Sequence, residues 1–312
     1  MRPDYKNWMP KGMIYSFAAG AAVSALLCLL FARAGLLAGG TLKTVLIVIF
    51  AVLTMIFCGL TIWSVLMYRA FDYNGKRQMS RQIIEGVAAY VVLPAGGKCL
   101  DVGCGSGALA ISVAKRNPSA SVVGIDRWGK EYASFSKALC ERNAQAEKVK
   151  NTSFQRGDAT RLEFPDETFD AVTSNYVYHN IPGKVALPSG QSYSSSKSWN
   201  GTARIKDSRR ATARQRYLLE TLRTLKKGGT FAIHDIFSAS KYGDMQAFVK
   251  KLKAMRRILL LGTMRPDNPL NMAAGAIPAS AAMILFQRLT SKPLEKFNLT
   301  KGGEWLIVYK VS

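Results

Sequence analysis

Residues 100–107, LDVGCGSG, join a short apolar stretch (KCLDV, 98–102) to a segment with helical spacing (GALAISVAKR, 107–116). Glycines at a turn between a strand and a helix let the backbone approach a ligand closely and adopt the unusual φ angles of a tight turn. The helix that follows presents unpaired backbone N–H groups at its first turn. This stretch therefore predicts an α/β fold with a nucleotide-binding strand–turn–helix unit.

Segments of helical and strand-like pattern alternate from Met79 onward, which is typical of an open α/β sheet. We expect helices at 80–93, 107–116, 130–144, 211–225 (running to Gly228-Gly229) and 243–255, and strands at 98–103, 121–126, 151–158, 169–175, 230–237 and 304–311.

Other polar and glycine residues follow the strands at the places where a nucleotide site needs them. Asp126 ends the second strand, at about the distance expected for a carboxylate that binds ribose hydroxyls. Because Gly103, Gly105 and Ala108 also satisfy the dinucleotide pattern G-x-G-x-x-A, these residues alone allow either kind of nucleotide cofactor.

The later motifs decide between the cofactors: GDAT (157–160), LEFPDETFD (162–170), SNYVYHNI (174–181) and LLETLRTLKKGGTFAIHD (218–235). With LDVGCGSG and GID (124–126), they resemble the class I S-adenosylmethionine-dependent methyltransferases, particularly the branch that acts on small molecules and quinone-like lipids. The resemblance implies a Rossmann-like, doubly wound, mostly parallel sheet of seven strands that binds S-adenosylmethionine.

The resemblance also assigns cofactor contacts. The implied cofactor-binding residues are Asp101, Gly103, Cys104, Gly105, Gly107, Asp126, Arg127, Trp128, Asp158, Ala159 and Asn175. In such enzymes the methionine part lies at the first acid and the glycine loop, the ribose at the second carboxylate, and the adenine between the next two motifs. Asn175 is expected near the reactive methyl group. A helix cap or a turn is the alternative role for each acid.

Methyl transfer from an activated sulfonium mainly needs the nucleophile to be placed in line with the methyl group. A base is needed only where that nucleophile must lose a proton. His179 and Tyr176 follow the fourth strand and are the predicted catalytic residues, His179 as a base or as a group that orients the acceptor. The alternative is that His179 caps or packs at the start of a helix. Other local candidates are Tyr178, His234 and Asp235.

Residues 12–32 and 44–68 carry no charge, and each is long enough to cross a bilayer as a helix. A short connection separates them, so they predict a two-helix transmembrane hairpin within residues 1–69, followed by a methyltransferase domain at 70–312. A cleaved signal peptide is the alternative for the first segment. Cations are more frequent outside the hairpin than in its loop, which predicts a multi-pass protein of the cell membrane with both termini and the catalytic domain in the cytoplasm.

The chain is strongly basic, with 43 Lys and Arg against 20 Asp and Glu and a net charge of +23. The cations gather at 69–81, at 184–227 (which includes an insertion at 184–210) and at 250–265. Such clusters attract anionic lipid or nucleic acid. We expect these clusters to bind an anionic membrane surface, and we expect the methyl acceptor to be small or lipophilic. The alternatives are an RNA methyltransferase or nucleic-acid-binding protein, although the Asn/Asp-Pro-Pro-Tyr/Phe motif of base-amine methylation is absent, and a scaffold that binds cofactor without catalysis.

The five cysteines form no CxxC pair, and the chain has two histidines. No zinc-ligand set has a known spacing, so no metal is predicted. Unpatterned cysteines suit a reducing compartment.

Overall fold

The computed structural model describes residues 2–33, 40–129, 133–181, 212–235, 242, 258–264 and 304–310. It divides into two compact units. One unit comprises residues 6–81, and the other comprises residues 1–5 together with 82–312. The insertion 184–210, the predicted helix 243–255 and the basic cluster from 250 to 257 lie outside the described residues.

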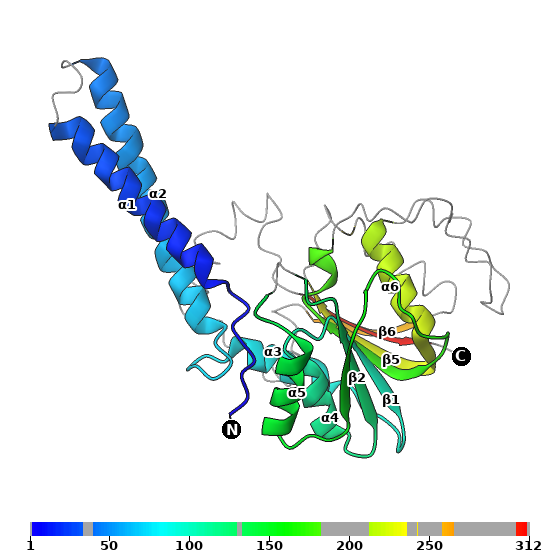
Figure 1. Ribbon diagram of the computed structural model, residues 1–312. Coiled ribbons are helices and arrows are strands. Elements are labelled where there is room, and N and C mark those ends of the chain that lie inside the picture. The colour runs from blue at the N-terminus through cyan, green and yellow to red at the C-terminus, as the bar shows by residue number, and fades with distance from the viewer. Residues whose placement is uncertain are drawn as a thin grey trace. The chain divides into compact units, whose positions relative to one another are not determined.

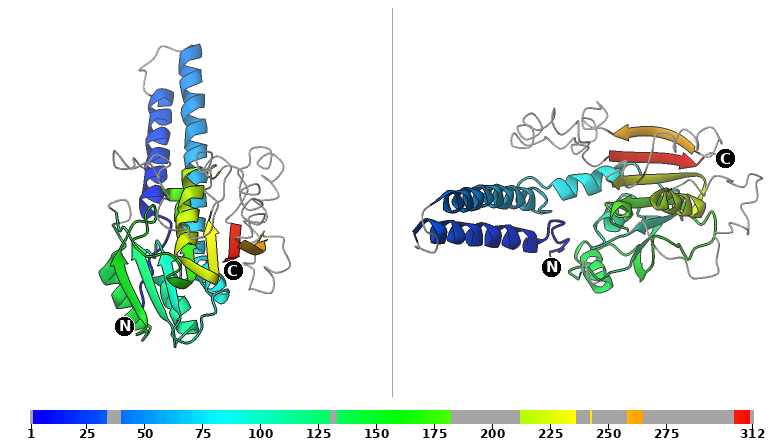
Figure 2. Two further views of the ribbon diagram at one scale, coloured as in Figure 1. Left: turned by 90° about the vertical axis from the view of Figure 1, so that its right-hand side faces the viewer. Right: turned by 90° about the horizontal axis from the view of Figure 1, so that it is seen from above.

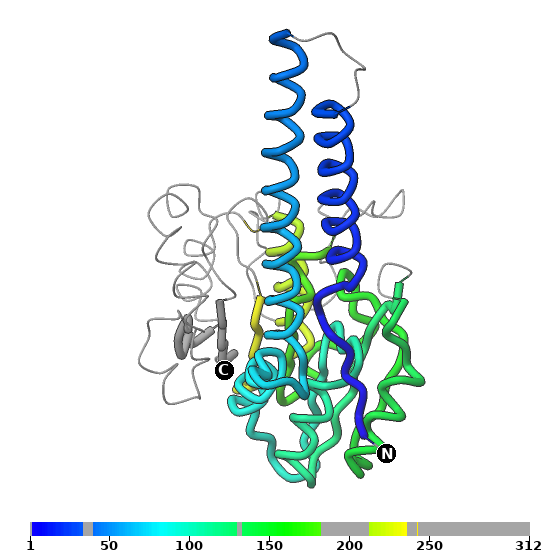
Figure 3. Tube along the Cα trace, turned by 90° about the vertical axis from the view of Figure 1, so that its left-hand side faces the viewer, coloured from blue at the N-terminus to red at the C-terminus, as the bar shows by residue number. Residues whose placement is uncertain are grey.

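The smaller unit is a pair of long helices, α1 (Lys11–Arg33) and α2 (Thr41–Ala70), which run side by side (Figure 3). A Cβ atom on Gly20 of α1 would lie 3.1 Å from the Phe57 ring of α2, so the missing side chain lets the helices approach closely. Many large apolar side chains of both helices are exposed, and none of them is buried. Both helices are long and apolar enough to be candidate membrane spans.

The larger unit is built on a sheet of five parallel strands. Its parallel strands are β1 (Lys98–Val102), β2 (Ser121–Asp126), β3 (Thr152–Arg156), β4 (Phe169–Asn175) and β5 (Leu225–Asp235). They lie in the order β3-β2-β1-β4-β5. Two strands, β7 (Glu304–Lys310) and β6 (Ile258–Met264), pair antiparallel beyond β5, drawn in red and orange in Figure 2. The predicted Rossmann-like, mostly parallel fold is confirmed for the five parallel strands.

Helices cover both faces of this sheet (Figure 1). On one face lie α3 (Met79–Ala89), α4 (Ala108–Arg116) and α5 (Lys137–Ala146), and α6 (Ala213–Thr224) lies on the other. The β-strands bury near-continuous apolar runs, as in Cys99–Leu100 and Ala171–Val172, because both faces are covered. The strand order reverses between β1 and β4, and in this fold a ligand binds beside the carboxyl ends of the strands at that point.

Several predicted boundaries were wrong, each for a local reason. The helix predicted at 130–144 begins only at Lys137, because the Ser136 side chain caps it by accepting from the Leu139 N–H. The helix predicted at 211–225 ends at Thr224, and β5 already begins at Leu225, where a bulge in its pairing with β4 accommodates the Lys226–Gly229 run. Strand β6 was not predicted, because a short apolar run such as ILLL fits either a helix or a strand.

Candidate active site

The glycine loop after β1 has the backbone conformation that only glycine adopts easily. Gly103 has a φ of 74°, and a Cβ there would lie 2.3 Å from the Val177 side chain in the turn after β4. Gly107 has a φ of 82° and caps the first turn of α4. The Gly103 and Cys104 N–H groups donate to the Ile125 carbonyl at the end of β2, which fixes the start of the loop.

Asp101 lies beneath this loop, with 1% of its surface exposed. It accepts hydrogen bonds from the Thr173 hydroxyl (2.9 Å) and the Ala110 N–H (3.1 Å). Burial raises the pKa of Asp101 to about 7, against the lowering effect of these two bonds. A carboxyl group so placed has a strong preference for a cationic neighbour, which the ammonium end of the implied cofactor would supply.

Asp126 joins the glycine loop to the loop after β2. Its two carboxylate oxygens accept from the Gly105 N–H (2.8 Å) and the Trp128 N–H (2.7 Å). The Trp128 indole N–H in turn donates to the Gly105 carbonyl at 3.0 Å. Each carboxylate oxygen can accept more than one hydrogen bond, so the Asp126 side chain can still take ribose hydroxyls. The predicted loop, carboxylate and tryptophan are therefore brought together in one cradle.

The remaining predicted adenine contacts follow β2 and β3. Arg127 is exposed next to Trp128. Asp158 is exposed, and its side chain accepts from the Thr160 N–H at 2.8 Å, the turn role that the sequence left open. Ala159 is partly buried and packs against the apolar core. The Gly157 N–H donates to the Asp126 carbonyl, so this turn begins beside the carboxylate.

The turn after β4 carries the residues that are predicted to lie near the reactive methyl group. Asn175 Oδ1 lies 2.9 Å from Nδ1 of His234, which is buried on β5. Tyr176 has a φ of 55°, strained for a side chain of this size, and its ring packs edge-on against His234 and His179. The Tyr176 N–H donates to the His234 carbonyl, which locks the turn to the neighbouring strand.

His179 is paired with a buried carboxylate. Its Nδ1 contacts Oδ1 of Asp235, whose side chain is fully buried at the end of β5. The other carboxylate oxygen accepts from the Tyr178 N–H (2.9 Å), the Tyr242 hydroxyl (2.9 Å) and the His179 N–H (3.3 Å). With 12% of the His179 side chain exposed, the ring lies at the edge of the domain rather than in its core. This arrangement orients one ring nitrogen and leaves Nε2 as the other position for a proton.

Tyr176 is poorly suited to act as a base. Burial, together with the charge of Asp235, raises the pKa of its hydroxyl above the usual range, so the group keeps its proton at neutral pH. Of the two predicted catalytic residues, His179 therefore has the better chemistry for accepting a proton, and Tyr176 can contribute its ring and a hydrogen-bond donor.

Two features were not found from the sequence. Tyr242 is fully buried and donates to Asp235, but it lies in a segment with no motif. Arg214, assigned from the sequence to a lipid-binding cluster, donates to the carbonyls of Tyr178 (3.2 Å) and Ile181 (2.7 Å) and so holds the turn that carries His179. No sequence pattern distinguishes this arginine from the others in a basic helix, so its role could not be predicted.

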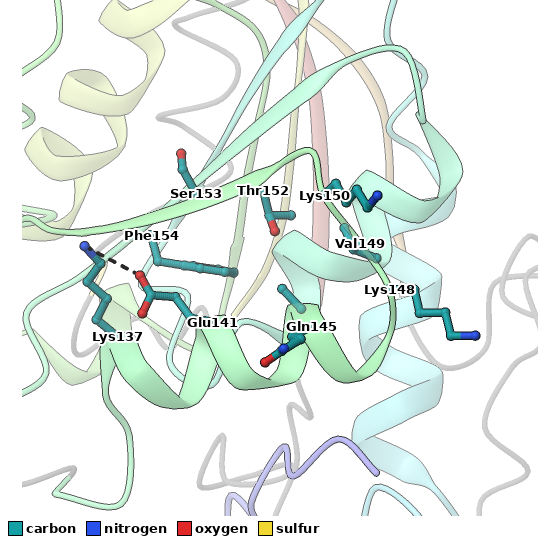
Figure 4. Close-up of a pocket in the computed structure, with 10 residues that line it drawn as sticks. Lys137, Glu141, Gln145, Lys148, Val149, Lys150, Thr152, Ser153 and Phe154 are labelled. Carbon is teal, nitrogen blue, oxygen red and sulfur yellow. Dashed lines mark ion pairs between the residues drawn. The ribbon is translucent and has the colours of Figure 1, made fainter. Parts of the chain in front are cut away.

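A surface hollow of about 640 Å³ lies elsewhere, over α5 and β3 (Figure 4). Its lining includes Lys137, Glu141, Lys148 and Phe154, and Lys137 pairs with Glu141 at 3.6 Å. None of the predicted site residues lines it.

The comparisons with known proteins give the family of this chain. Residues 93–276 match a family model described as a methyltransferase domain. A demethylmenaquinone methyltransferase of Lactobacillus johnsonii is 36% identical over 89 residues, which is 28% of this chain and 35% of the relative. A 2-phytyl-1,4-naphthoquinone methyltransferase of Synechococcus elongatus is 42% identical over 88 residues, 28% of this chain and 36% of the relative.

Among solved structures, a TehB-like methyltransferase from Corynebacterium glutamicum is 16% identical, with a TM-score of 0.39 over 73% of this chain and 87% of that one. The chain spans about a third of the length of the two curated relatives. Since the family model covers more than half of the sequence, the chain belongs to the methyltransferase domain family.

Proposed function

We propose that this protein is a membrane-anchored methyltransferase that transfers the methyl group to a small lipophilic acceptor of the quinone-like class. The observation that carries the proposal is the pair of exposed apolar helices in the same chain as the methyltransferase unit. The names of the two quinone methyltransferase relatives support the acceptor class. In this proposal β7 and β6 complete the seven-stranded sheet that the sequence predicts.

The cofactor would be held by the glycine loop, by Asp126 at the ribose hydroxyls and by Asp101 near the amino group, with Asn175 beside the methyl end. The loop glycines and both carboxylates fit that group, since a Cβ at Gly105 would meet only the Phe135 ring, at 3.9 Å, and no side chain fills the cradle there. The bound cofactor supplies an activated methyl group, so the protein needs mainly to place the acceptor. Trp128, Arg127 and Asp158 would border the adenine, with Ala159 at its ring.

His179 is the proposed base, and Asp235 is its positioning residue. With Nδ1–H directed to the carboxylate, the lone pair of the imidazole lies on Nε2, where it can take a proton from an acidic hydroxyl or ring carbon of the acceptor. Asp235 also stabilises the imidazolium that forms. Tyr176, whose ring packs against His179, would form part of the acceptor wall.

The hairpin would keep the enzyme where its acceptor dissolves, which raises their effective concentration. The proposed orientation has both termini and the catalytic unit in the cytoplasm of a multi-pass membrane protein. Reporter fusions test it: a reporter after Leu37 should be external, and a reporter at Ser312 cytoplasmic. A cytoplasmic reporter at Leu37, or a mature chain starting near Arg33, would overturn this orientation.

The acceptor class is tested by label transfer. The full chain in lipid nanodiscs is incubated with methyl-labelled S-adenosylmethionine, a membrane lipid extract and total RNA. The proposal predicts label in a lipid-soluble product that mass spectrometry identifies. Label in RNA alone would contradict it and favour the nucleic-acid alternative that the net charge of +23 suggests.

A further inference from the structure

Residues 2–5 lie far from the methyltransferase segment in sequence yet belong to the same compact unit. They run beside α5 and the glycine loop, with the chain end marked N in Figure 3. We propose that these residues form a strap that holds the glycine loop in its cofactor-binding conformation, so that strap docking and cofactor binding strengthen each other. The proposal rests on the cofactor site proposed above.

Asn143 of α5 is the centre of the contact. Its Oδ1 accepts from the Asp4 N–H at 2.7 Å, and its Nδ2 donates to the Asp4 carbonyl at 3.0 Å. The same Nδ2 donates to the Ser106 carbonyl in the glycine loop at 2.9 Å. One amide side chain, 2% exposed, therefore joins the strap, the loop and the helix.

A second connection runs directly from the loop to the strap. The Ser106 hydroxyl donates to the Tyr5 carbonyl at 2.9 Å, and Ser106 lies between Gly105 and Gly107, both in left-handed conformation. Tyr5 itself is 3% exposed, and its hydroxyl donates to Glu147 at 3.3 Å. The ring is thus a buried part of the methyltransferase unit rather than a solvated tail.

These contacts bear on the most flexible part of the site. A loop with three glycines loses much conformational entropy when it is ordered around a ligand. Because Ser106 is hydrogen-bonded to both Asn143 and Tyr5, the loop is already restricted before the cofactor binds. This restriction lowers the entropic cost of cofactor binding. By thermodynamic linkage, a cofactor that orders the loop must stabilise the docked strap by the same factor.

The strap also constrains the membrane topology. It precedes α1 in sequence, whereas the glycine loop and α5, which it contacts, follow α2. Docking requires that both ends of the hairpin lie on one side of the membrane. It further means that a soluble fragment starting at residue 70 lacks the strap that holds its glycine loop.

The test uses the full chain in nanodiscs and measures binding of S-adenosylhomocysteine by calorimetry. Asp4→Pro removes the N–H that donates to buried Asn143, and Asp4→Ala is its matched control because it keeps that N–H. Tyr5→Ala removes the buried ring, and Tyr5→Phe keeps it. Asp4→Pro and Tyr5→Ala should each raise the dissociation constant about fivefold or more, since each leaves a buried group unsatisfied or a cavity. The two controls should stay within about twofold of the parent.

Hydrogen exchange on the unaltered chain is the second measurement. Saturating S-adenosylhomocysteine should slow exchange at the Asp4 amide. Equal affinity in all four variants, with no change in exchange at Asp4, would overturn the strap while leaving the proposed function intact. Absence of any binding by the unaltered chain would overturn both.

Discussion

Replacing Asp235 by asparagine should remove most of the methyl transfer activity while leaving the fold and cofactor binding in place. Three groups that face Oδ2 are donors: the N–H groups of Tyr178 and His179 and the hydroxyl of Tyr242. The amide oxygen of the introduced asparagine must therefore take the Oδ2 position, and its NH₂ must face Nδ1 of His179. The ring proton then moves to Nε2, and the nitrogen proposed to accept a proton loses its lone pair.

A positioned general base contributes about 10²–10⁴-fold to rate, so we expect Asp235→Asn to lower kcat by about that factor. The assay is the initial rate of label transfer from S-adenosylmethionine to the lipid acceptor, with binding of S-adenosylhomocysteine measured beside it. Tyr242→Phe is the matched control, because it removes one donor to Oδ2 and keeps the His179–Asp235 pair, and it should lose less than about tenfold. A kcat within about threefold of the parent in Asp235→Asn would refute the base assignment.

Other predictions follow from the cradle and its charges. Asp126→Ala should weaken cofactor binding by about 1–3 kcal/mol, because ribose hydroxyls lose their acceptor; unchanged affinity in calorimetry would assign Asp126 to the turn alone. Because the pKa of Asp101 is raised to about 7 in the folded chain, its contribution to stability is present below the ordinary value of 3.8 and is lost as pH rises to about 7. A cationic cofactor favours the ionised carboxyl, so S-adenosylmethionine affinity should rise with pH up to about 7 and then level off; Asp101→Asn should lose that dependence, and a pH-independent affinity in the parent would contradict the assignment. Gly103→Ala should lower the melting temperature, since its Cβ would lie 2.3 Å from Val177 at a positive φ; an unchanged melting temperature would show that the turn can shift freely.

The parallel part of the fold could be predicted because each strand has a local signature. Strands such as 121–126 and 169–175 are short segments with an apolar centre that end in a polar residue, and the structure gives them the same bounds. The strand at 258–264 could not be predicted, because its partner is 304–310 and only that long-range pairing decides between helix and strand. Ends of helices were misplaced where a cap or a bulge, rather than apolar periodicity, sets the boundary.

The sequence could predict that the residues after β1, β2 and β4 lie together, since parallel strands bring their carboxyl ends to one edge of the sheet. The environment of each of these residues could not be predicted. That Asp101 is buried against Thr173, that Asp235 orients His179, and that Asn143 holds Asp4 are all contacts between segments distant in sequence. The strap in particular has no pattern of its own, because Asn143 recognises backbone groups that any residue would supply.

Calorimetry of the full chain in nanodiscs tests the central claim, that the glycine loop and Asp126 form an S-adenosylmethionine site, most directly. The account predicts that S-adenosylmethionine and S-adenosylhomocysteine both bind at one site and compete, and that NAD does not bind. The Asp126→Ala chain should bind both ligands more weakly without unfolding. Binding of NAD with no binding of S-adenosylmethionine would contradict the account.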